Sequence, residues 1–198
     1  MPTSFWGWIY FGSLVLCWAA FLIVWCAGAL YNAFKAPAVQ KQSGQLFSWG
    51  LGIILVCAAL FLTPLSVWNF LTFDIFWLRL LGLILLLTST AFTLWARYVL
   101  GLMWTSSPVI KSEHILHTDG LYRIMCHLIY TGLLGMLIGS LLISGGGKWF
   151  VGVVVALIIF KVKIVMEERL LLSTFGERYV QFKESVPQLI PFTRWNRS

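Results

Sequence analysis

Long apolar stretches separated by short polar segments dominate the pattern of this chain. About 20 consecutive apolar residues are enough to cross a bilayer as a helix, so each long stretch predicts a membrane span. The pattern therefore predicts an all-α integral membrane helical bundle. Its five expected spans are residues 6–30, 46–68, 75–94, 128–143 and 149–160. The helix of the third span can continue to residue 102, and Lys161 either makes the fifth span short or brings its end toward water.

The basic residues of the connecting segments predict the orientation of this bundle. Of the 14 Lys and Arg residues, 12 fall in alternate segments on one side, and Arg79 and Lys148 fall on the other. Because cytosolic loops carry the excess of Lys and Arg, we expect the N-terminus outside and the C-terminus in the cytosol. The residues before the first stretch contain no Lys or Arg, so we expect a retained first span rather than a cleaved signal peptide.

Composition supports the same class. The 198 residues are 60% hydrophobic and 11% charged, with a mean hydropathy of +0.88. A soluble domain has about a quarter of its residues charged, so we expect one membrane domain over residues 1–198. Residues 1–98 form its three-span part, and residues 99–198 form a loop, a two-span hairpin and a cytosolic tail. Topology accounts for the net charge of +7, so we expect no nucleic-acid partner. The small size favours a prokaryotic plasma membrane over an endoplasmic reticulum.

Glycines predict how the fourth span packs and where it ends. Gly132, Gly135 and Gly139 share one helical face, which lets another helix approach closely. The run SGGGK at residues 144–148 predicts a tight turn to the fifth span. It lacks the flanking strand and the Lys-Ser/Thr ending of a phosphate-binding loop.

Two polar clusters interrupt the apolar background. Residues 114–130 (HILHTDGLYRIMCHLIY) contain three histidines, two tyrosines and an arginine. The second cluster, one hairpin later, contains Lys163, Glu167 and Glu168, of which the first two share a helix face. Carboxylates at the end of a span are costly without a partner, so we expect the clusters to meet at the membrane surface as a cofactor site. A solvated helix end with one ion pair is the structural alternative, and the residues alone leave both open.

Several other kinds of site have little support. The chain contains no HExxH or CxxC pattern, so we expect no metal site. It contains neither the GxSxG elbow of hydrolases nor the GxGxxG fingerprint of dinucleotide-binding domains. The four cysteines have no paired spacing, and we expect no disulfide.

Residues 100–192 contain, in order, the motifs LGLMW, HILH, GLYRIMCHLIYTG, KIVMEERLLLSTFGERYVQF and QLIPF. The order and spacing of these motifs resemble the isoprenylcysteine carboxyl methyltransferase family. Related membrane methyltransferases act on phospholipid amines and small thiols. It implies an enzyme that uses S-adenosylmethionine and a lipid or hydrophobic acceptor held in the bilayer.

The resemblance also implies roles for individual residues. Glu167 would take the methionyl ammonium of the cofactor, and Lys163 stands where the family has an arginine facing the substrate. Glu168 or a histidine would accept a proton if the acceptor is an amine. Lys163, Glu167 and Glu168 are thus the candidate catalytic residues. The cofactor-binding residues implied by position are His114, Ile115, Leu116, His117, Tyr122, His127, Leu128, Ile129, Tyr130 and Glu167.

The sequence departs from the family pattern at a few positions. Leu121 and Leu128 replace prolines, and Cys126 replaces an arginine. Lys163 keeps the charge of the substrate arginine but loses the fork that suits a carboxylate. The acceptor therefore stays open among a prenylcysteine carboxylate, a lipid amine and a thiol. A membrane reductase using NADPH, similar to sterol reductases, and a non-catalytic protein on the same scaffold are the alternatives.

Overall fold

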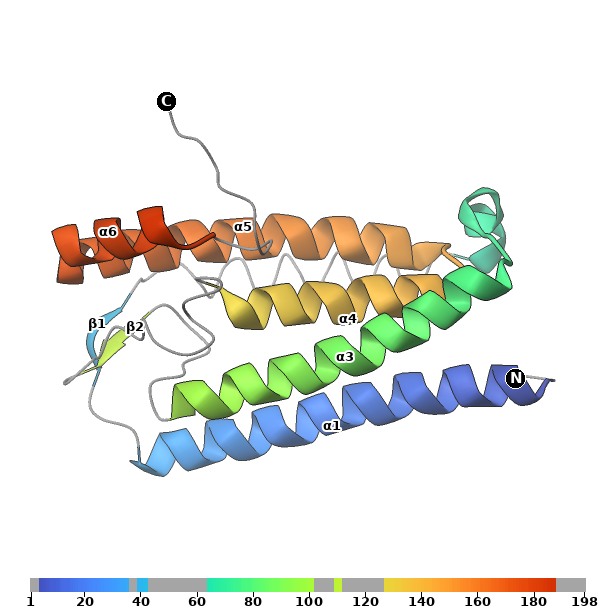
Figure 1. Cartoon of the computed structure of the whole chain (residues 1–198), viewed down its shortest axis with the longest axis horizontal. Coiled ribbons are helices and arrows are strands. Elements are labelled where there is room, and N and C mark those ends of the chain that lie inside the picture. Colours follow the sequence, from blue (N-terminus) through green and yellow to red (C-terminus); the bar gives the residue numbers. More distant parts are fainter. Residues whose placement is uncertain (1–3, 36–38, 43–63, 102–108, 112–126, 188–198) are drawn as a thin grey trace.

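Four long helices lie side by side in the described part of the computed structural model (Figure 1). The structure describes residues 4–35, 39–42, 64–101, 109–111 and 127–187. The long helices, in the order in which they pack, are α1 (Phe5–Lys35), α3 (Phe76–Leu100), α4 (Leu128–Ser144) and α5 (Lys148–Phe175). The shorter elements are β1 (Val39–Gln42), the 3-10 helix η1 (Leu65–Leu71), β2 (Val109–Lys111) and α6 (Glu177–Ser185).

The predicted helical membrane bundle is confirmed, while the ends of two predicted spans differ from the structure. Helices α1, α3 and α5 are long and apolar enough to cross a membrane, while α4 is shorter, with 17 residues. The predicted second span, residues 46–68, lies outside the described residues except at its end. There, Pro64 precedes η1 instead of continuing an α-helix. Proline has no N–H to donate, which disfavours an α-helix running through this point.

Helix α5 is longer than the predicted fifth span. It continues through Lys161 to Phe175 as one helix of 28 residues. At 1.5 Å per residue its length is about 42 Å, against about 30 Å for the hydrocarbon core of a bilayer. The helix is therefore longer than a bilayer core is thick, and Glu167 and Glu168 lie about 30 Å from its start.

Helix α4 packs closely against α3, as its glycine spacing predicts. A Cβ added at Gly132 or Gly135 would collide with hydroxyl-bearing side chains of α3, and one at Gly139 would collide with the backbone of Leu86. Small residues thus let the two backbones approach. The core formed with α1 contains Tyr10, Cys17, Leu86, Met136 and Ile143.

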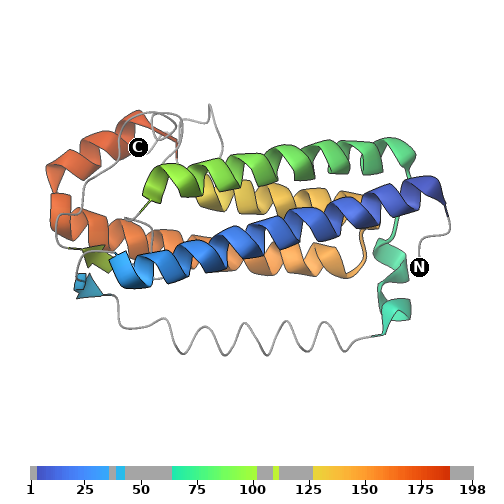
Figure 2. The same ribbon diagram turned by 90° about the horizontal axis from the view of Figure 1, so that it is seen from below.

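The turn between α4 and α5 is hydrogen-bonded to the end of η1 and to the segment that follows it. Gly145, Gly146 and Gly147 have φ values of 75°, 91° and 64°, which glycine adopts without strain. The Phe73 N–H donates to the Gly145 carbonyl at 2.8 Å, and the Gly147 N–H donates to the Leu71 carbonyl at 3.2 Å. Figure 2 shows this turn, η1 and the start of α1 at the same end of the bundle.

The opposite end carries a small sheet and α6 (Figure 1). Strands β1 and β2 pair antiparallel, with Val39 opposite Lys111. The sequence does not signal them because each has only three or four residues, too few for a strand period. Gly176, with φ 52°, lets the chain reverse after α5, so α6 doubles back along it. Helix α4 begins at this same end.

Candidate functional site

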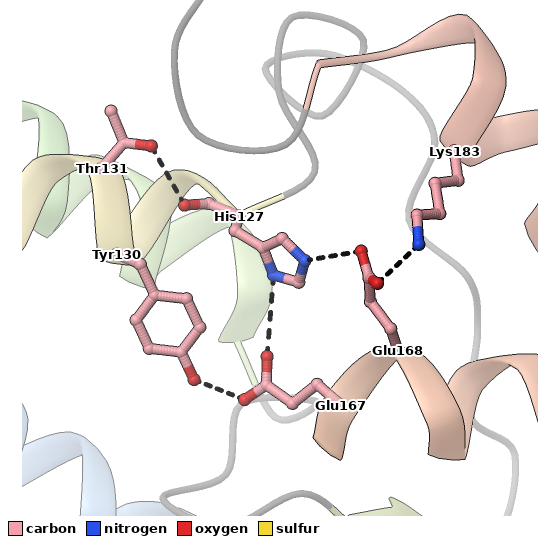
Figure 3. Close-up of polar contacts among 6 residues, drawn as sticks. All are labelled: His127, Tyr130, Thr131, Glu167, Glu168 and Lys183. Carbon is pink, nitrogen blue, oxygen red and sulfur yellow. Dashed lines mark hydrogen bonds and ion pairs between the residues drawn. The ribbon is translucent and has the colours of Figure 1, made fainter. Parts of the chain in front are cut away.

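His127 begins helix α4 and points its imidazole toward α5 (Figure 3). It is the N-cap residue, with φ −118° and ψ 58°. Its carbonyl accepts the amide N–H of Thr131 at 3.1 Å and the hydroxyl of Thr131 at 3.3 Å. These bonds fix the backbone where the helix starts. The histidine is buried, with 7% of the residue exposed.

Two consecutive carboxylates of α5 flank this imidazole, one beside each ring nitrogen. Nδ1 of His127 lies 3.7 Å from Oε2 of Glu167, and Nε2 lies 3.8 Å from Oε1 of Glu168. Both distances exceed those of direct hydrogen bonds, so each carboxylate acts on the imidazole electrostatically rather than through a direct hydrogen bond. Nε2 has no hydrogen-bond partner among the residues that the structure describes. Since buried polar atoms usually have one, this nitrogen is a candidate contact for a bound molecule.

Tyr130 engages the other oxygen of Glu167. Its hydroxyl donates to Oε1 at 2.5 Å, and its ring centroid lies 5.2 Å from that of Phe160 and 5.9 Å from that of His127. His127 and Tyr130 are three residues apart, so they lie on the same side of α4. Glu167, with 27% of its side chain exposed, therefore has one oxygen hydrogen-bonded to α4 and the other facing the N-cap residue of that helix.

Lys163 lies one helical turn before Glu167 on α5. Residues four apart on a helix are neighbours, and the two opposite charges attract. The structure thus brings together the second predicted cluster and the end of the first. The predicted site residues that meet are His127, Tyr130, Lys163, Glu167 and Glu168.

Leu128 and Ile129, also expected to bind the cofactor, lie in an apolar cluster. Leu128 is 1% exposed and packs with Ala96 of α3, and Ile129 and Phe182 surround the same cluster. One residue along a helix turns the side chain by about 100°, which directs Leu128 away from the carboxylates that His127 faces. The contacts of Leu128 within the described residues are apolar side chains, so it contributes to packing between α4 and α3. The other expected cofactor residues, His114, Ile115, Leu116, His117 and Tyr122, lie outside the described residues.

Lys183, which the sequence analysis does not predict, completes the cluster (Figure 3). Its Nζ donates to Oε2 of Glu168 at 2.5 Å, and the side chains of Glu168 and Lys183 are 13% and 22% exposed. The two residues are 15 positions apart, and only the reversal at Gly176 brings them together. No helical spacing rule signals a pair that forms across such a turn.

The cluster suits a polar, cationic molecule. Glu167 and Glu168 provide carboxylates for an ammonium group, and the rings of Tyr130 and Phe160 attract a cation. Within the described part of the chain, no group of three or more His, Cys, Asp or Glu side chains is arranged to hold a metal ion. S-adenosylmethionine, which carries an ammonium and a sulfonium, fits this set of groups.

The fold and the site together define a class, a helical membrane protein with an acidic, histidine-centred cluster at one end of its bundle. Residues 77–178, which include α3, α4 and α5, match the family described as phospholipid methyltransferase. Because the match spans more than half of the chain, the protein belongs to this family.

Two curated proteins are similar to part of the chain, which confirms the resemblance seen in the motifs. Protein-S-isoprenylcysteine O-methyltransferase of Schizosaccharomyces pombe is 32% identical over 85 residues, covering 41% of this chain and 35% of the relative. Protein-S-isoprenylcysteine O-methyltransferase B of Arabidopsis thaliana is 29% identical over 119 residues, covering 59% of this chain and 60% of the relative. The chain thus spans less than two thirds of either relative.

A solved structure shares the fold. It is that of the eukaryotic intramembrane Ras methyltransferase, isoprenylcysteine carboxyl methyltransferase, with a TM-score of 0.55 and 24% identity. The likeness covers 80% of this chain and 56% of that one. Both curated relatives come from eukaryotes, so the expected preference for a prokaryotic plasma membrane finds no support.

Proposed function

We propose that this protein transfers a methyl group from S-adenosylmethionine to a membrane-borne acceptor at the cytosolic edge of the bilayer. The observation that carries the proposal is the imidazole of His127 between Glu167 and Glu168, with Tyr130 hydrogen-bonded to Glu167. Membership of the phospholipid methyltransferase family and the names of the two relatives support the reaction class.

The side chains of the site would bind and align the reactants. S-adenosylmethionine, when bound, supplies a methyl group on a positively charged sulfur. The Glu167 carboxylate would hold the ammonium group, and the Tyr130 hydroxyl would keep that carboxylate turned toward the pocket. The buried His127 and Leu128 keep water from this side of the site. Because methyl transfer is an in-line displacement, such alignment is the main source of rate.

Two acceptor classes fit this arrangement. The relatives are named for isoprenylcysteine and the family for phospholipids. A prenylcysteine carboxylate is already a nucleophile, and the ammonium of Lys163 would attract it. A phospholipid amine must first lose a proton, which His127 or Glu168 would accept. Both acceptors reside in the bilayer, and α5 carries the site to its edge.

We predict that Glu167→Ala and His127→Ala abolish S-adenosylmethionine binding. The first removes the carboxylate that would meet the ammonium, and the second removes the group that both carboxylates flank. A hydrogen bond to a charged group contributes about 1.5–3 kcal/mol, so losing one lowers the affinity about ten- to a hundredfold, and losing the whole contact should take binding below detection. Isothermal titration calorimetry of the purified protein measures the effect.

A matched control and two other cofactor outcomes complete this experiment. Glu177→Ala removes an exposed carboxylate at the start of α6 and should leave the affinity unchanged. Unchanged affinity in both site variants would refute the site assignment. Binding of NADPH instead would favour a membrane reductase, and binding of neither cofactor would favour a non-catalytic protein. Transfer of labelled methyl to a farnesylcysteine analogue or to phosphatidylethanolamine would then identify the acceptor class.

A further inference from the structure

Glu168 uses its two carboxylate oxygens for different partners (Figure 3). Oε2 accepts a hydrogen bond from Nζ of Lys183 at 2.5 Å, while Oε1 faces Nε2 of His127 at 3.8 Å. A carboxylate held by an ammonium on one oxygen cannot rotate freely, so the contact with Lys183 sets where Oε1 points. Glu167 differs, because Tyr130 of α4 already orients it.

Helix α6 is anchored in a way that presents Lys183 to Glu168. Tyr179 is 2% exposed, and Phe182 packs on the apolar cluster around Leu128. Tyr179, Phe182 and Lys183 follow the spacing of residues on one helix face, which is the face toward the bundle. Arg178 on the same helix is exposed. The inward face of α6 therefore fixes the position of the Lys183 side chain.

The contact matters for the imidazole of His127. Its Nε2 is buried and has no hydrogen-bond partner in the described residues. At 3.8 Å, Glu168 attracts positive charge on the imidazole without using the hydrogen-bonding capacity of this nitrogen. The nitrogen is thus left to contact a bound molecule, in an electrostatic environment that Glu168 sets.

We propose that Lys183 is a positioning residue of the cofactor site: by pairing with Glu168 it holds that carboxylate against His127, which makes α6 part of the site. The inference rests on the proposed function, because S-adenosylmethionine binding is its measure. Lys183 lies beyond residues 77–178, so the family match does not assign it a role.

S-adenosylmethionine binding to the full chain in lipid nanodiscs tests this role. We expect Lys183→Met to weaken binding about tenfold, because a partly buried, charge-assisted hydrogen bond is lost. Lys183→Arg keeps the positive charge and should restore the affinity to within about threefold of wild type. In a Glu168→Gln background, Lys183→Met should change the affinity by less than about twofold, because the residue through which Lys183 acts is already altered.

Arg178→Met serves as the matched control, since it removes the same charge from the exposed side of α6 and should bind like wild type. If Lys183→Met does not fold, Lys183→Gln replaces it. Wild-type affinity in the Lys183 variant would overturn the inference. An equal loss in the Glu168→Gln background would also overturn it, because Lys183 would then only support the fold of α6. A wild-type protein that binds no S-adenosylmethionine would instead refute the proposed function itself.

Discussion

The hydroxyl of Tyr130 orients the Glu167 carboxylate within the site. It donates to Oε1 of Glu167, while Oε2 of the same carboxylate faces His127. Each of the two glutamates thus has one oxygen held by a donor and one oxygen directed at the imidazole. Tyr130 performs for Glu167 what Lys183 performs for Glu168.

Tyr130→Phe tests the first of these two arrangements. It removes one oxygen atom and keeps the ring beside Phe160. A hydrogen bond to a charged group contributes about 1.5–3 kcal/mol, so S-adenosylmethionine affinity should fall at least about tenfold. Calorimetry measures the change. Tyr98→Phe removes a hydroxyl from a side chain that is 84% exposed and should have no effect. Wild-type affinity in Tyr130→Phe would mean that Glu167 does not need this donor.

At the residue scale, the sequence predicts the two glutamates of the site better than it predicts the residues that orient them. Glu167 and Glu168 are conspicuous because charges are rare at the end of an apolar stretch. Lys183 is one of several basic residues in a polar tail, and its role depends on a reversal in the chain that spacing does not show. Leu128 follows His127 in a single motif, yet the helical twist turns the two side chains in different directions, one toward the core and one toward the acids.

At the scale of elements, the helix pair α3 and α4 supports the site. Gly139 of α4 lies against the α3 backbone at Leu86, and Gly82 of α3 lies against the α4 backbone at Gly139. This contact fixes α4, and therefore His127 at its start, relative to α3. The long helices are predictable because a bilayer requires continuous apolar stretches, whereas β1 and β2 are too short to leave a pattern.

Gly139→Ala tests this packing against Gly152→Ala in α5. A Cβ at Gly139 meets backbone atoms that cannot move aside, whereas one at Gly152 meets nothing within 4 Å among the residues that the structure describes. We expect the first substitution to cost about 1–3 kcal/mol of unfolding free energy, as overpacking does. The second should be neutral or slightly stabilising. Thermal unfolding in detergent, followed by circular dichroism, compares the two. Equal midpoints would show that the close α3–α4 approach contributes little to stability.

At the scale of the whole molecule, the two ends of the bundle differ in charge. The end with η1 and the glycine turn carries Arg79 and Lys148, while the end with the site carries the charged termini of α1 and α5 and all of α6. By the positive-inside rule, this distribution predicts that the site lies on the cytosolic side. Both a water-soluble cofactor and a lipid-borne acceptor would reach a site at that level.

Cysteine labelling tests the orientation directly. In a variant without native cysteines, Lys148→Cys should react with an impermeant maleimide added outside the cell. Glu177→Cys, in α6, should react only after the membrane is opened, because the positive-inside rule puts that end in the cytosol. The reverse pattern would place the site on the extracytoplasmic side and contradict access to the cofactor from the cytosol.

The continuity of α5 has a mechanical consequence. From Gly147 to Glu167 the helix forms an arm of about 30 Å, so a rotation of about 2° at the turn would move the carboxylates by about 1 Å. His127 belongs to α4, which is locked to α3 and would not follow that movement. The backbone hydrogen bonds that hold Gly145 and Gly147 to Phe73 and Leu71 therefore fix the end of α5 about which such a rotation would occur. How accurately the acids meet the imidazole is decided partly at the opposite end of the bundle, where α5 begins.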